Sequence, residues 1–358
     1  MFPYLALASV SSYFAIVGRA RERSLLLLFL MCLWVALLIG LRSNVGMDWN
    51  NYVIVWYKSL ESPLLDMLAS AEPGWGLLLY LARETGIGLT GVNLIAGLVF
   101  GFGLFQLLKE CDEPLLALCA ALPILVIATA MSALRQSLAL GIEFIVIAHW
   151  RSWPVAMRAG GLLLAASFHF SAIFLLAFLA ADPRLLRSNL KWLALPVGAI
   201  GLFVATRSAR FENYTQDYSQ ADSVQSSGVY LHLALLLVPF AIYAWRRKVW
   251  GERFGSLLLL DAMGLAFVAC LAIAPISSVS AGRFSLYLWP AAIIIYAALP
   301  KLFDTPRAQV GIRVIIVAVA ALMTVIWLTY SNSRNAYVPY QSIWISNDAR
   351  TRGTGVLP

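Results

Sequence analysis

The sequence has few charged residues and no pattern of paired cysteines, and these two shortages exclude whole classes of protein. Only 12% of its 358 residues are charged and 61% are hydrophobic, well above the roughly 45–50% apolar content of soluble domains. The four cysteines are spaced without pairing, so we predict neither a disulfide framework nor a zinc site: Cys32, Cys111, Cys119 and Cys270. The composition instead predicts an integral membrane protein.

Several signatures of catalysis and of metal or nucleotide binding are also absent. The chain contains no P-loop, no GxSxG elbow, no HExxH motif and no DxD pair of carboxylates. Nucleotide-driven transport, a serine hydrolase and a dedicated metal site are therefore poorly supported. We expect no cofactor and no metal.

The net charge of +8 comes from 26 Lys and Arg residues, which lie in short patches between apolar runs. Basic patches placed in this way orient transmembrane helices and contact anionic lipid. The expected partner of these patches is the lipid bilayer, and nucleic acid is not expected.

Apolar runs that can cross a hydrocarbon core of ~30 Å as helices recur along the whole chain. We predict one all-α polytopic domain over residues 1–358, with about ten transmembrane helices and no soluble domain attached. We expect the first span to be retained, since the basic group RARER follows it. The predicted spans are roughly 2–18, 24–41, 87–108, 115–133, 137–149, 192–206, 229–245, 255–275, 284–300 and 313–330.

The basic residues orient the chain, because short loops rich in Lys and Arg stay in the cytoplasm. The basic segments are 19–23, 151–158, 246–253 and 301–313. The long loops 42–74 and 207–228 are poorer in Lys and Arg for their length. We therefore predict that these two loops, the N-terminus and the tail 331–358 lie outside the cytoplasm.

One segment, 159–181, breaks the alternation of spans. As a single helix of about 34 Å it could cross once, but two basic groups would then lie on the wrong side. Two short arms, 159–168 and 170–181, meeting at His169 return every basic group to the cytoplasm. We predict this re-entrant hairpin, which requires a cavity lined by protein.

Four polar clusters then fall on one side of the membrane: Arg42 with Asp48, Arg135 with Gln136, His169, and Arg283. Charges at a membrane boundary are costly unless they pair or meet a ligand. Three arginines at one mouth suit a diphosphate, because a guanidinium group binds phosphate oxygens bidentately and keeps its charge. The alternative is that Arg135 ends an exposed turn and contacts lipid headgroups.

His169 and Asp48 are the candidates for moving a proton. Imidazole accepts or donates protons near neutral pH, although a histidine among aromatic residues is often part of a core. Asp48 is the first candidate among the outer carboxylates and Glu72 is the second. For Glu143 and Asp261, which lie within apolar helices, functional and structural roles are both open.

Five motifs resemble those of the EpsG family of Wzy-like polysaccharide polymerases in order and approximate spacing. They are RSNVGMDWNNY, ALRQSLALGI, ASFHFSAIF, GRFSLYLWP and YVPYQSIW, and the resemblance covers roughly residues 40 to 344. The family usually has an Asp-Tyr pair where this chain has Asp48-Trp49. The positions that match the family's motifs are Arg42, Gly46, Asp48, Tyr52, Arg135, Gln136, His169, Arg283, Pro339 and Tyr340.

The resemblance implies a GT-C-like glycosyltransferase of the bacterial inner membrane, with its active site facing the periplasm. The implied reaction moves a growing glycan from undecaprenyl diphosphate onto an incoming lipid-linked repeat unit, without a metal. The implied partners are undecaprenyl-diphosphate-linked oligosaccharides, a chain-length regulator and a flippase. We assign catalysis to His169, Asp48 and Arg135, and substrate binding to Arg42, Arg283, Gln136, Tyr52, Trp49, Tyr340 and Glu72.

The chemistry of these residues agrees with such a transfer. Displacing a diphosphate from an anomeric carbon develops negative charge that fixed arginines stabilise, and deprotonating the acceptor hydroxyl needs a base. Aromatic residues of the outer loops could stack on sugar rings, although such residues are also common at membrane interfaces. They are Trp49, Tyr52, Trp56, Tyr57, Tyr214 and Tyr218.

Three other functions remain open at this point. An O-antigen ligase shares the donor but makes a single transfer instead of a ladder of chain lengths. A lipid-linked oligosaccharide flippase or other transporter would have a site near the bilayer midplane between related repeats. A membrane acyltransferase would use the histidine as a base and add acyl groups to the glycan.

Overall fold

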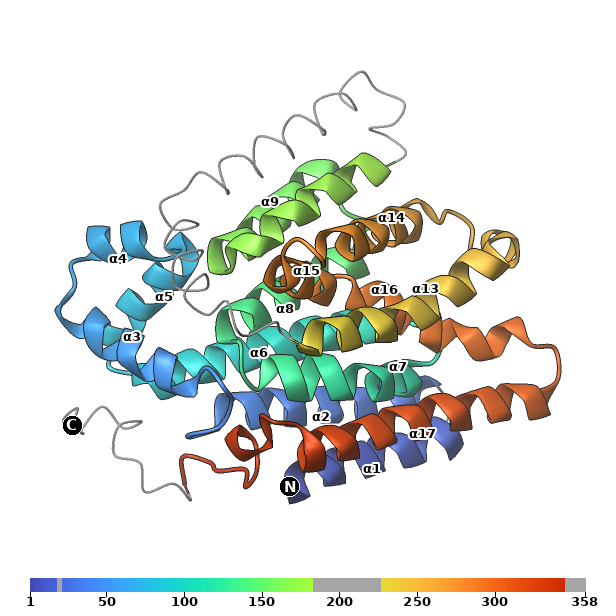
Figure 1. Cartoon of the computed structure of the whole chain (residues 1–358), viewed down its shortest axis with the longest axis horizontal. Coiled ribbons are helices and arrows are strands. Elements are labelled where there is room, and N and C mark those ends of the chain that lie inside the picture. The colour runs from blue at the N-terminus through green and yellow to red at the C-terminus, as the bar shows by residue number, and fades with distance from the viewer. Residues whose placement is uncertain (18–20, 183–226, 345–358) are drawn as a thin grey trace. The chain divides into compact units, whose positions relative to one another are not determined.

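The computed structural model describes residues 1–17, 21–182 and 227–344 (Figure 1). Every regular element within these residues is a helix, and one isolated antiparallel bridge joins Arg42 to Ser342. The chain divides into two compact units: unit 1 is Met1–Ala148, Ser167–His169 and Tyr296–Pro358, and unit 2 is His149–Ala166 and Phe170–Ile295. The prediction of an all-α chain is confirmed for the described residues.

Unit 1 is built on long apolar helices whose chain direction alternates. They are α1 (Phe2–Val17), α2 (Arg21–Gly40), α6 (Gly88–Lys109), α7 (Pro114–Ala121) with the π-helix η1 (Leu122–Ala130) that continues it, α8 (Leu134–Ala148) and α17 (Pro306–Tyr330). The predicted spans in this part of the chain coincide with these helices. Helix α17 begins seven residues earlier than predicted, because Thr305 caps it by accepting a hydrogen bond from the Ala308 N–H.

Glycines allow α6 to lie very close to its two neighbours. A Cβ atom on Gly97 would be 2.3 Å from the carbonyl oxygen of Ala36 on α2. A Cβ atom on Gly103 would be 2.0 Å from the carbonyl oxygen of Gly141 on α8. Such close backbone contact is a common basis of helix association in lipid, where van der Waals packing replaces the hydrophobic effect. Helix α6 is thereby fixed between α2 and α8.

The two ends of these helices differ in character. At one end, ion pairs join the acidic turn 109–114 to the basic segment 301–313, and one of them is Arg313 Nε to Glu113 Oε2 at 2.6 Å. The opposite end, named the site end here, carries residues 42–52, because α6 runs about 22 Å from Leu94, which contacts Gly40, to Lys109 at this acidic turn. The polar motif and the basic segment therefore lie at opposite ends of these helices, and which end faces the cytoplasm stays a prediction.

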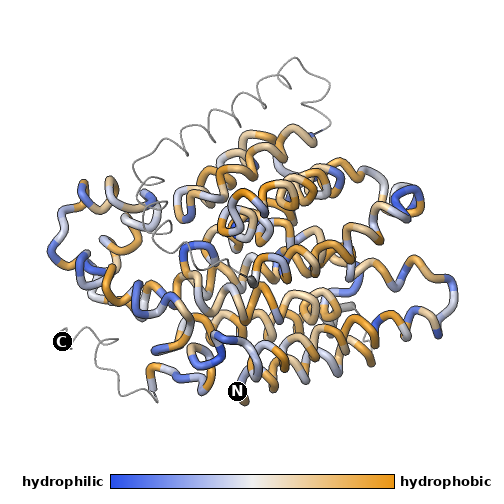
Figure 2. The backbone as a smooth tube through the Cα atoms, viewed as in Figure 1, coloured by the Kyte–Doolittle hydropathy of each residue, from blue (hydrophilic) through white to orange (hydrophobic). Residues whose placement is uncertain are grey.

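The chain is a helical membrane-embedded protein by the length and hydropathy of its helices. Among the described residues three helices can cross a bilayer, Gly88–Lys109, Gly228–Phe254 and Pro306–Tyr330, and the pair Ser278–Leu286 and Trp289–Leu302, bent by 47°, would make a fourth. Six shorter apolar helices accompany them in the same part of the chain. Figure 2 shows hydrophobic residues along the helices and hydrophilic residues concentrated at turns. The total of about ten spans stays a prediction, and the predicted span 192–206 and nearly all of the loop 207–228 lie outside the described residues.

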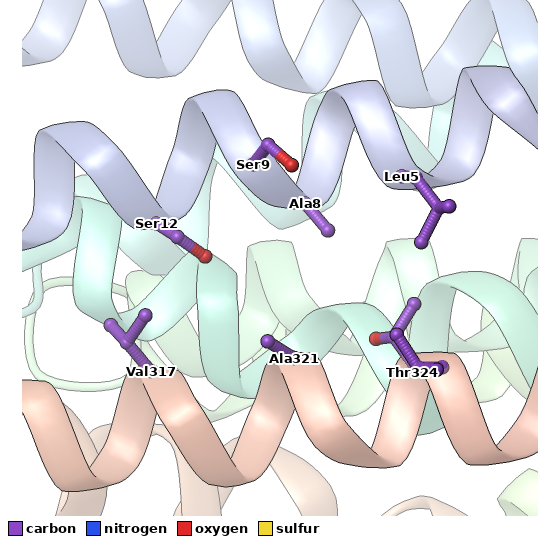
Figure 3. Close-up of a pocket in the computed structure, with 8 residues that line it drawn as sticks. Leu5, Ala8, Ser9, Ser12, Val317, Ala321 and Thr324 are labelled. Atoms are coloured by element: carbon purple, nitrogen blue, oxygen red, sulfur yellow. The ribbon is translucent and has the colours of Figure 1, made fainter.

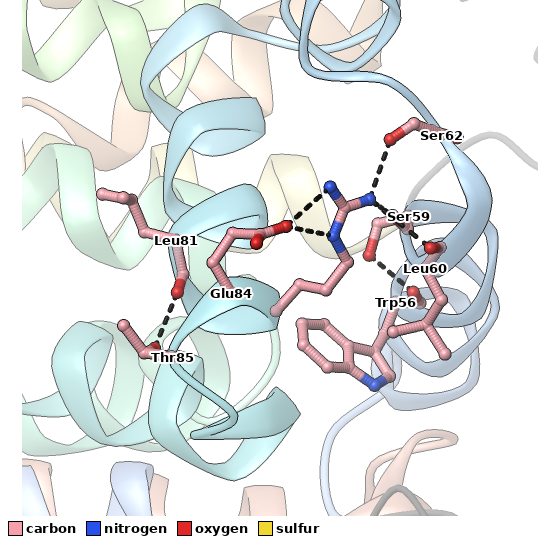
Figure 4. A network of polar contacts seen from close by, with 8 residues as sticks. Trp56, Ser59, Leu60, Ser62, Leu81, Glu84 and Thr85 are labelled. Carbon is pink, nitrogen blue, oxygen red and sulfur yellow. Dashed lines mark hydrogen bonds and ion pairs between the residues drawn. The ribbon is translucent and has the colours of Figure 1, made fainter.

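The predicted outer loop 42–74 is largely helical. It contains α3 (Trp49–Glu61) and α4 (Leu64–Ser70), and α5 (Pro73–Glu84) follows. Arg83 on α5 donates hydrogen bonds to the carbonyl oxygens of Ser59 and Ser62, each at 2.8 Å, where α3 ends. Figure 4 shows this network around Ser59, Ser62 and Glu84. The last carbonyls of a helix lack partners within it, so Arg83 satisfies them and ties α3 to α5.

The segment after unit 1's α8 folds back on itself at His169. Helix α9 (Val155–Phe168) ends just before this residue and the 3-10 helix η2 (Phe170–Ala181) begins just after it. Arg158 on α9 and Asp182 after η2 form a buried ion pair, whereas one straight helix would hold them about 36 Å apart. The reversal occurs at the predicted residue. That both arms stay in one half of the bilayer remains a prediction.

Unit 2 also contains α13 (Ser227–Phe254), α14 (Leu258–Ile273), α15 (Ser278–Leu286) and the first part of α16 (Trp289–Ala298). The end of α16 and the short 3-10 helix η3 (Leu299–Leu302) belong to unit 1. Helix α15 packs against α13, α14 and η2. Asp261 on α14 accepts hydrogen bonds from Tyr243 at 2.8 Å and from Arg247 at 2.6 and 2.8 Å. These contacts give Asp261 a structural role between α13 and α14.

An apolar groove of about 220 Å³ lies between α1 and α17. Figure 3 shows Leu5, Ala8 and Ser12 of α1 facing Val317, Ala321 and Thr324 of α17 across it. The Thr324 hydroxyl donates to the carbonyl oxygen of Ala320 within its own helix. No residue that lines the groove is charged, so the groove does not have the chemistry of a diphosphate site.

Candidate active site

The first two motifs pack together at the site end of unit 1. Gly46 has a φ of +102°, and a Cβ atom on it would lie 2.1 Å from the carbonyl oxygen of Met131. Both the left-handed backbone and the close approach require glycine here. The Asp48 N–H donates to Ser132 Oγ at 3.2 Å, and the Arg135 N–H donates to Tyr52 Oη at 3.5 Å. Residues 42–52 and the break between η1 and α8 thus form one structure.

Glu72 brings Arg135 and His169 together in that structure. Arg135 Nη1 lies 2.7 Å from Glu72 Oε2, and His169 Nδ1 lies 3.6 Å from Glu72 Oε1. The side chain of Arg135 is 29% exposed, whereas those of Glu72 and His169 are 7% and 9% exposed. Arg135 is therefore the member of this cluster that a ligand reaches first.

The carboxylate of Glu72 is held in its charged form. Burial alone would raise the pKa of Glu72, but the hydrogen bond with His169 and the charges of Arg135 and His169 outweigh burial and lower the pKa to about 2. Glu72 is therefore a fixed negative charge at neutral pH. It cannot serve as a general acid there, and its influence on the cluster is electrostatic.

Local sequence explains the position of Glu72. It is the residue before α5, and Pro73 occupies the first helical position, where proline's fixed φ suits a helix start. A Cβ atom on Gly74 would lie 2.4 Å from Ser167 Oγ, so the start of α5 lies directly against the tip of the hairpin. The ring of Tyr52 lies 5.6 Å from that of Trp75, between centroids. These contacts hold α3, α5 and the hairpin tip together around the cluster.

Arg42 has a different setting. It is fully buried, and its Nη1 and Nη2 atoms donate to the carbonyl oxygens of Ala130 and Ser132 at 3.0 and 3.4 Å. Ala130 is the last residue of η1, so the guanidinium group lies at the negative end of a helix dipole. In the described part of the chain Arg42 forms no ion pair with a carboxylate. These contacts fasten α2 to η1.

Residues 334–344, named the C-terminal strap, lie over this arginine. Tyr337 Oη donates to the carbonyl oxygen of Ala128, and Tyr340 Oη to that of Leu38, both at 3.0 Å. Tyr340 therefore caps α2. Three backbone hydrogen bonds complete the attachment: Ser43 N to Gln341 O at 3.0 Å, Gly46 N to Ala336 O at 2.7 Å and Ile343 N to Leu41 O at 2.9 Å.

Three of the aromatic residues predicted to stack on sugars lie in the core. Trp49, Tyr52 and Trp56 are only 3%, 7% and 4% exposed, so their ring faces are covered in this conformation, and Tyr57 is half-buried. Tyr214 and Tyr218 lie outside the described residues. The observed contacts make the buried rings part of the packing of α3.

The remaining predicted residues are distributed over both units. Gln136 is buried beside Arg135 on α8, and Asp48 is half-buried before α3, where its side chain caps no helix N–H. Arg283 is half-buried on α15 of unit 2. Glu143 is fully buried on α8. Among the residues that the structure describes, no three His, Cys, Asp or Glu side chains gather as a metal-binding set.

Sequence reasoning placed Asp48 ahead of Glu72, whereas the geometry puts Glu72 at the centre of the cluster. One signal could have favoured Glu72: in SAEPGW, Pro73 is typical of the first position of a helix, which places Glu72 directly before a helix start. A side chain at that position is fixed by the helix that follows it. Ser132, which binds the Asp48 N–H, was not singled out at all.

Comparison with known proteins identifies one family. A family model described as the EpsG family matches residues 25–342, a range that contains every candidate residue named above. No curated protein and no solved structure matches the chain. The GT-C-like architecture therefore stays a prediction.

Proposed function

Because the chain belongs to the EpsG family of Wzy-like polymerases, we propose that it joins lipid-diphosphate-linked oligosaccharide repeat units into a surface polysaccharide. The proposed carrier is undecaprenyl diphosphate, and the proposed place is the periplasmic face of a bacterial inner membrane. The observation that carries the proposal is the cluster of Arg135, Glu72 and His169 at the site end of unit 1. An accessible arginine beside a histidine is what this transfer requires.

In the proposed reaction, Arg135 binds the diphosphate of the donor. The acceptor hydroxyl attacks the anomeric carbon, the bond from that carbon to the diphosphate oxygen breaks, and its electron pair leaves with the diphosphate. His169 takes the hydroxyl proton as general base. Arg135 stabilises the negative charge that develops on the leaving oxygen. Product release then frees the lipid diphosphate.

Arg283 and Asp48 have secondary places in the proposal. Arg283 is the proposed second ligand of the diphosphate. Its guanidinium group, on α15 of unit 2, offers phosphate oxygens the same bidentate hydrogen bonds as that of Arg135. Asp48 is the alternative base, since it lies in the segment that packs against Arg135 and its side chain caps no helix N–H.

The proposed transfer is independent of divalent metal. The diphosphate charge is met by guanidinium groups, which also supply bidentate hydrogen bonds. The nearest carboxylate to Arg135, that of Glu72, is already engaged by the Arg135 guanidinium group and lies 3.6 Å from the His169 ring.

The test is chain extension by purified protein in lipid, supplied with a synthetic undecaprenyl-diphosphate-linked repeat unit. We expect a ladder of lengths on a gel, and the same ladder in excess chelator. A single transfer to a lipid A core acceptor would make the protein a ligase, and movement of the unit across the bilayer without transfer would make it a flippase. Activity lost in chelator and restored by one cation would contradict metal independence.

A further inference from the structure

We propose that Glu72 is an exchangeable counter-ion: it holds Arg135 until the donor diphosphate replaces it there, and it keeps its contact with His169 throughout. This inference rests on the proposed function and adds a positioning residue to it. Glu72 itself contacts no substrate and acts through Arg135 and His169, which do.

The geometry allows the two contacts to be separated. Glu72 Oε2 faces Arg135 and Glu72 Oε1 faces His169, so each partner has its own oxygen. Breaking the 2.7 Å contact to Arg135 leaves the 3.6 Å contact to His169 in place. A diphosphate offers the Arg135 guanidinium group anionic oxygens, the same kind of hydrogen-bond acceptor as the Glu72 carboxylate. It carries more negative charge and more oxygens than the carboxylate.

The exposure of the Arg135 and Glu72 side chains indicates which of the two changes partner. The Arg135 side chain is 29% exposed and that of Glu72 is 7% exposed, so an anion arriving from solvent meets the guanidinium group before it meets the carboxylate. Glu72 is fixed at the start of α5 against the hairpin tip. Arg135 therefore changes partner while Glu72 stays beside His169.

The exchange has a consequence for catalysis. A buried carboxylate that loses a cationic partner is strongly destabilised unless another positive charge compensates it. When His169 takes the acceptor proton, the imidazolium supplies that charge at 3.6 Å from Glu72 Oε1. Donor binding to Arg135 thus makes protonation of His169 more favourable, and the base becomes effective when the donor is present.

This role differs measurably from a purely structural one. If Glu72 only held the start of α5, removing its charge would weaken ligand binding and turnover together. If Glu72 competes with the diphosphate for Arg135, removing its charge tightens diphosphate binding while it slows turnover. The opposite signs of these two changes are the signature of the exchange.

The experiment measures binding of inorganic pyrophosphate by calorimetry, and single-turnover chain extension, with full-length protein in detergent or lipid. Glu72→Gln is expected to bind pyrophosphate about tenfold more tightly, because one hydrogen bond between charged groups no longer competes. Its turnover is expected to fall on the order of 10²-fold, since His169 loses the charge that stabilises its protonated form. Glu72→Asp, which keeps the charge, is expected to restore turnover in part.

Two controls make the outcomes decisive. Glu61→Gln removes the same charge by the same chemical change at the exposed end of α3 and should leave binding and turnover as in the wild type. Arg135→Ala should abolish pyrophosphate binding with either residue at position 72. Equal affinity of the wild type and Glu72→Gln, with binding still dependent on Arg135, overturns the exchange but leaves the diphosphate site. Binding that survives Arg135→Ala overturns the diphosphate site itself, and the exchange with it.

Discussion

Arg42 and Arg135 both match motif positions and both lie at the site end of unit 1, but their surroundings differ. Arg42 is fully buried and donates to backbone carbonyls at the end of η1. Arg135 is 29% exposed and pairs with a side-chain carboxylate. A carbonyl at a helix end cannot leave its place, whereas a carboxylate can give way to another anion. The same residue type therefore fastens the fold in one region and is available to a ligand in the other.

The largest effect on turnover is expected from a substitution of His169, the proposed base beside the Arg135–Glu72 pair. His169→Ala removes the proposed base, so turnover should fall roughly 10²–10⁴-fold, the usual contribution of a general base. Donor binding should change little, because Arg135 and Glu72 remain. The measurement is single-turnover chain extension beside donor binding, in protein shown to be folded. If His169→Ala keeps its turnover and Asp48→Asn loses it, the base is Asp48.

The next effect concerns the geometry of the accessible arginine. Arg135→Lys keeps the positive charge but loses the planar fork that binds two phosphate oxygens at once. We expect turnover to fall about 10²-fold, as when one donor to a developing oxyanion is removed. Donor binding and turnover of the variant should be compared with those of wild type. A variant that binds and turns over donor like wild type would remove Arg135 from the diphosphate site.

The matching substitution in the buried region should act on stability. Arg42→Lys cannot reach the carbonyls of both Ala130 and Ser132 with the same geometry, so the free energy of unfolding should fall by about 1–3 kcal/mol, the cost of an unsatisfied buried group. Pyrophosphate binding by the folded fraction should stay near the wild-type value. Thermal unfolding and calorimetry test this. If Arg42→Lys kept wild-type stability but lost pyrophosphate binding, Arg42 would be a ligand of the diphosphate. The proposed difference between Arg42 and Arg135 would then be wrong.

The smallest effect is a pH dependence carried by Glu72. Its pKa is lowered from 4.5 to about 2 in the folded protein, so it stabilises the fold above pH 4.5, and this contribution is lost as the pH falls toward 2. Between pH 6 and pH 4 the loss should be about 1 kcal/mol. The unfolding midpoint of wild type should therefore fall more over this range than that of Glu72→Gln. The Glu61→Gln variant, which removes an exposed carboxylate, should follow wild type; equal slopes for all three would contradict the expectation.

The helices were predictable from sequence for a physical reason. A backbone in lipid must satisfy its own hydrogen bonds, so a long apolar run has few alternatives to a helix. The reversal at His169 was also predictable, because the distribution of basic residues is inconsistent with a single crossing by 159–181. Both inferences use local sequence together with one property of the membrane.

The helices between α2 and α6 were missed because their polar residues suggested a loop. In α3, Trp49, Tyr52, Val53 and Trp56 are buried on one face, which is the period of an amphipathic helix. A span-by-span search for apolar runs does not detect such a pattern. The predicted outer loop is therefore a set of short helices that carries one side of the candidate site.

The partners within the site depend on tertiary structure. The contact between Glu72 and Arg135 joins residues 63 positions apart, and the burial of Arg42 depends on a strap more distant still. Neither follows from the spacing of residues in a motif. Sequence could name the arginines, the histidine and the carboxylates, but their environments decide which of them meets a ligand.

The C-terminal strap has a consequence for the order in which the protein is made. Tyr340 binds the carbonyl oxygen of Leu38, 302 positions earlier in the chain, so this contact forms only after almost the whole described chain has been translated and inserted. Until then the carbonyls at the end of α2 and the segment around Arg42 lack their cover. A ribosome that stops after α17 would release a chain with most of its helices and an unfinished site end, which quality-control proteases could recognise.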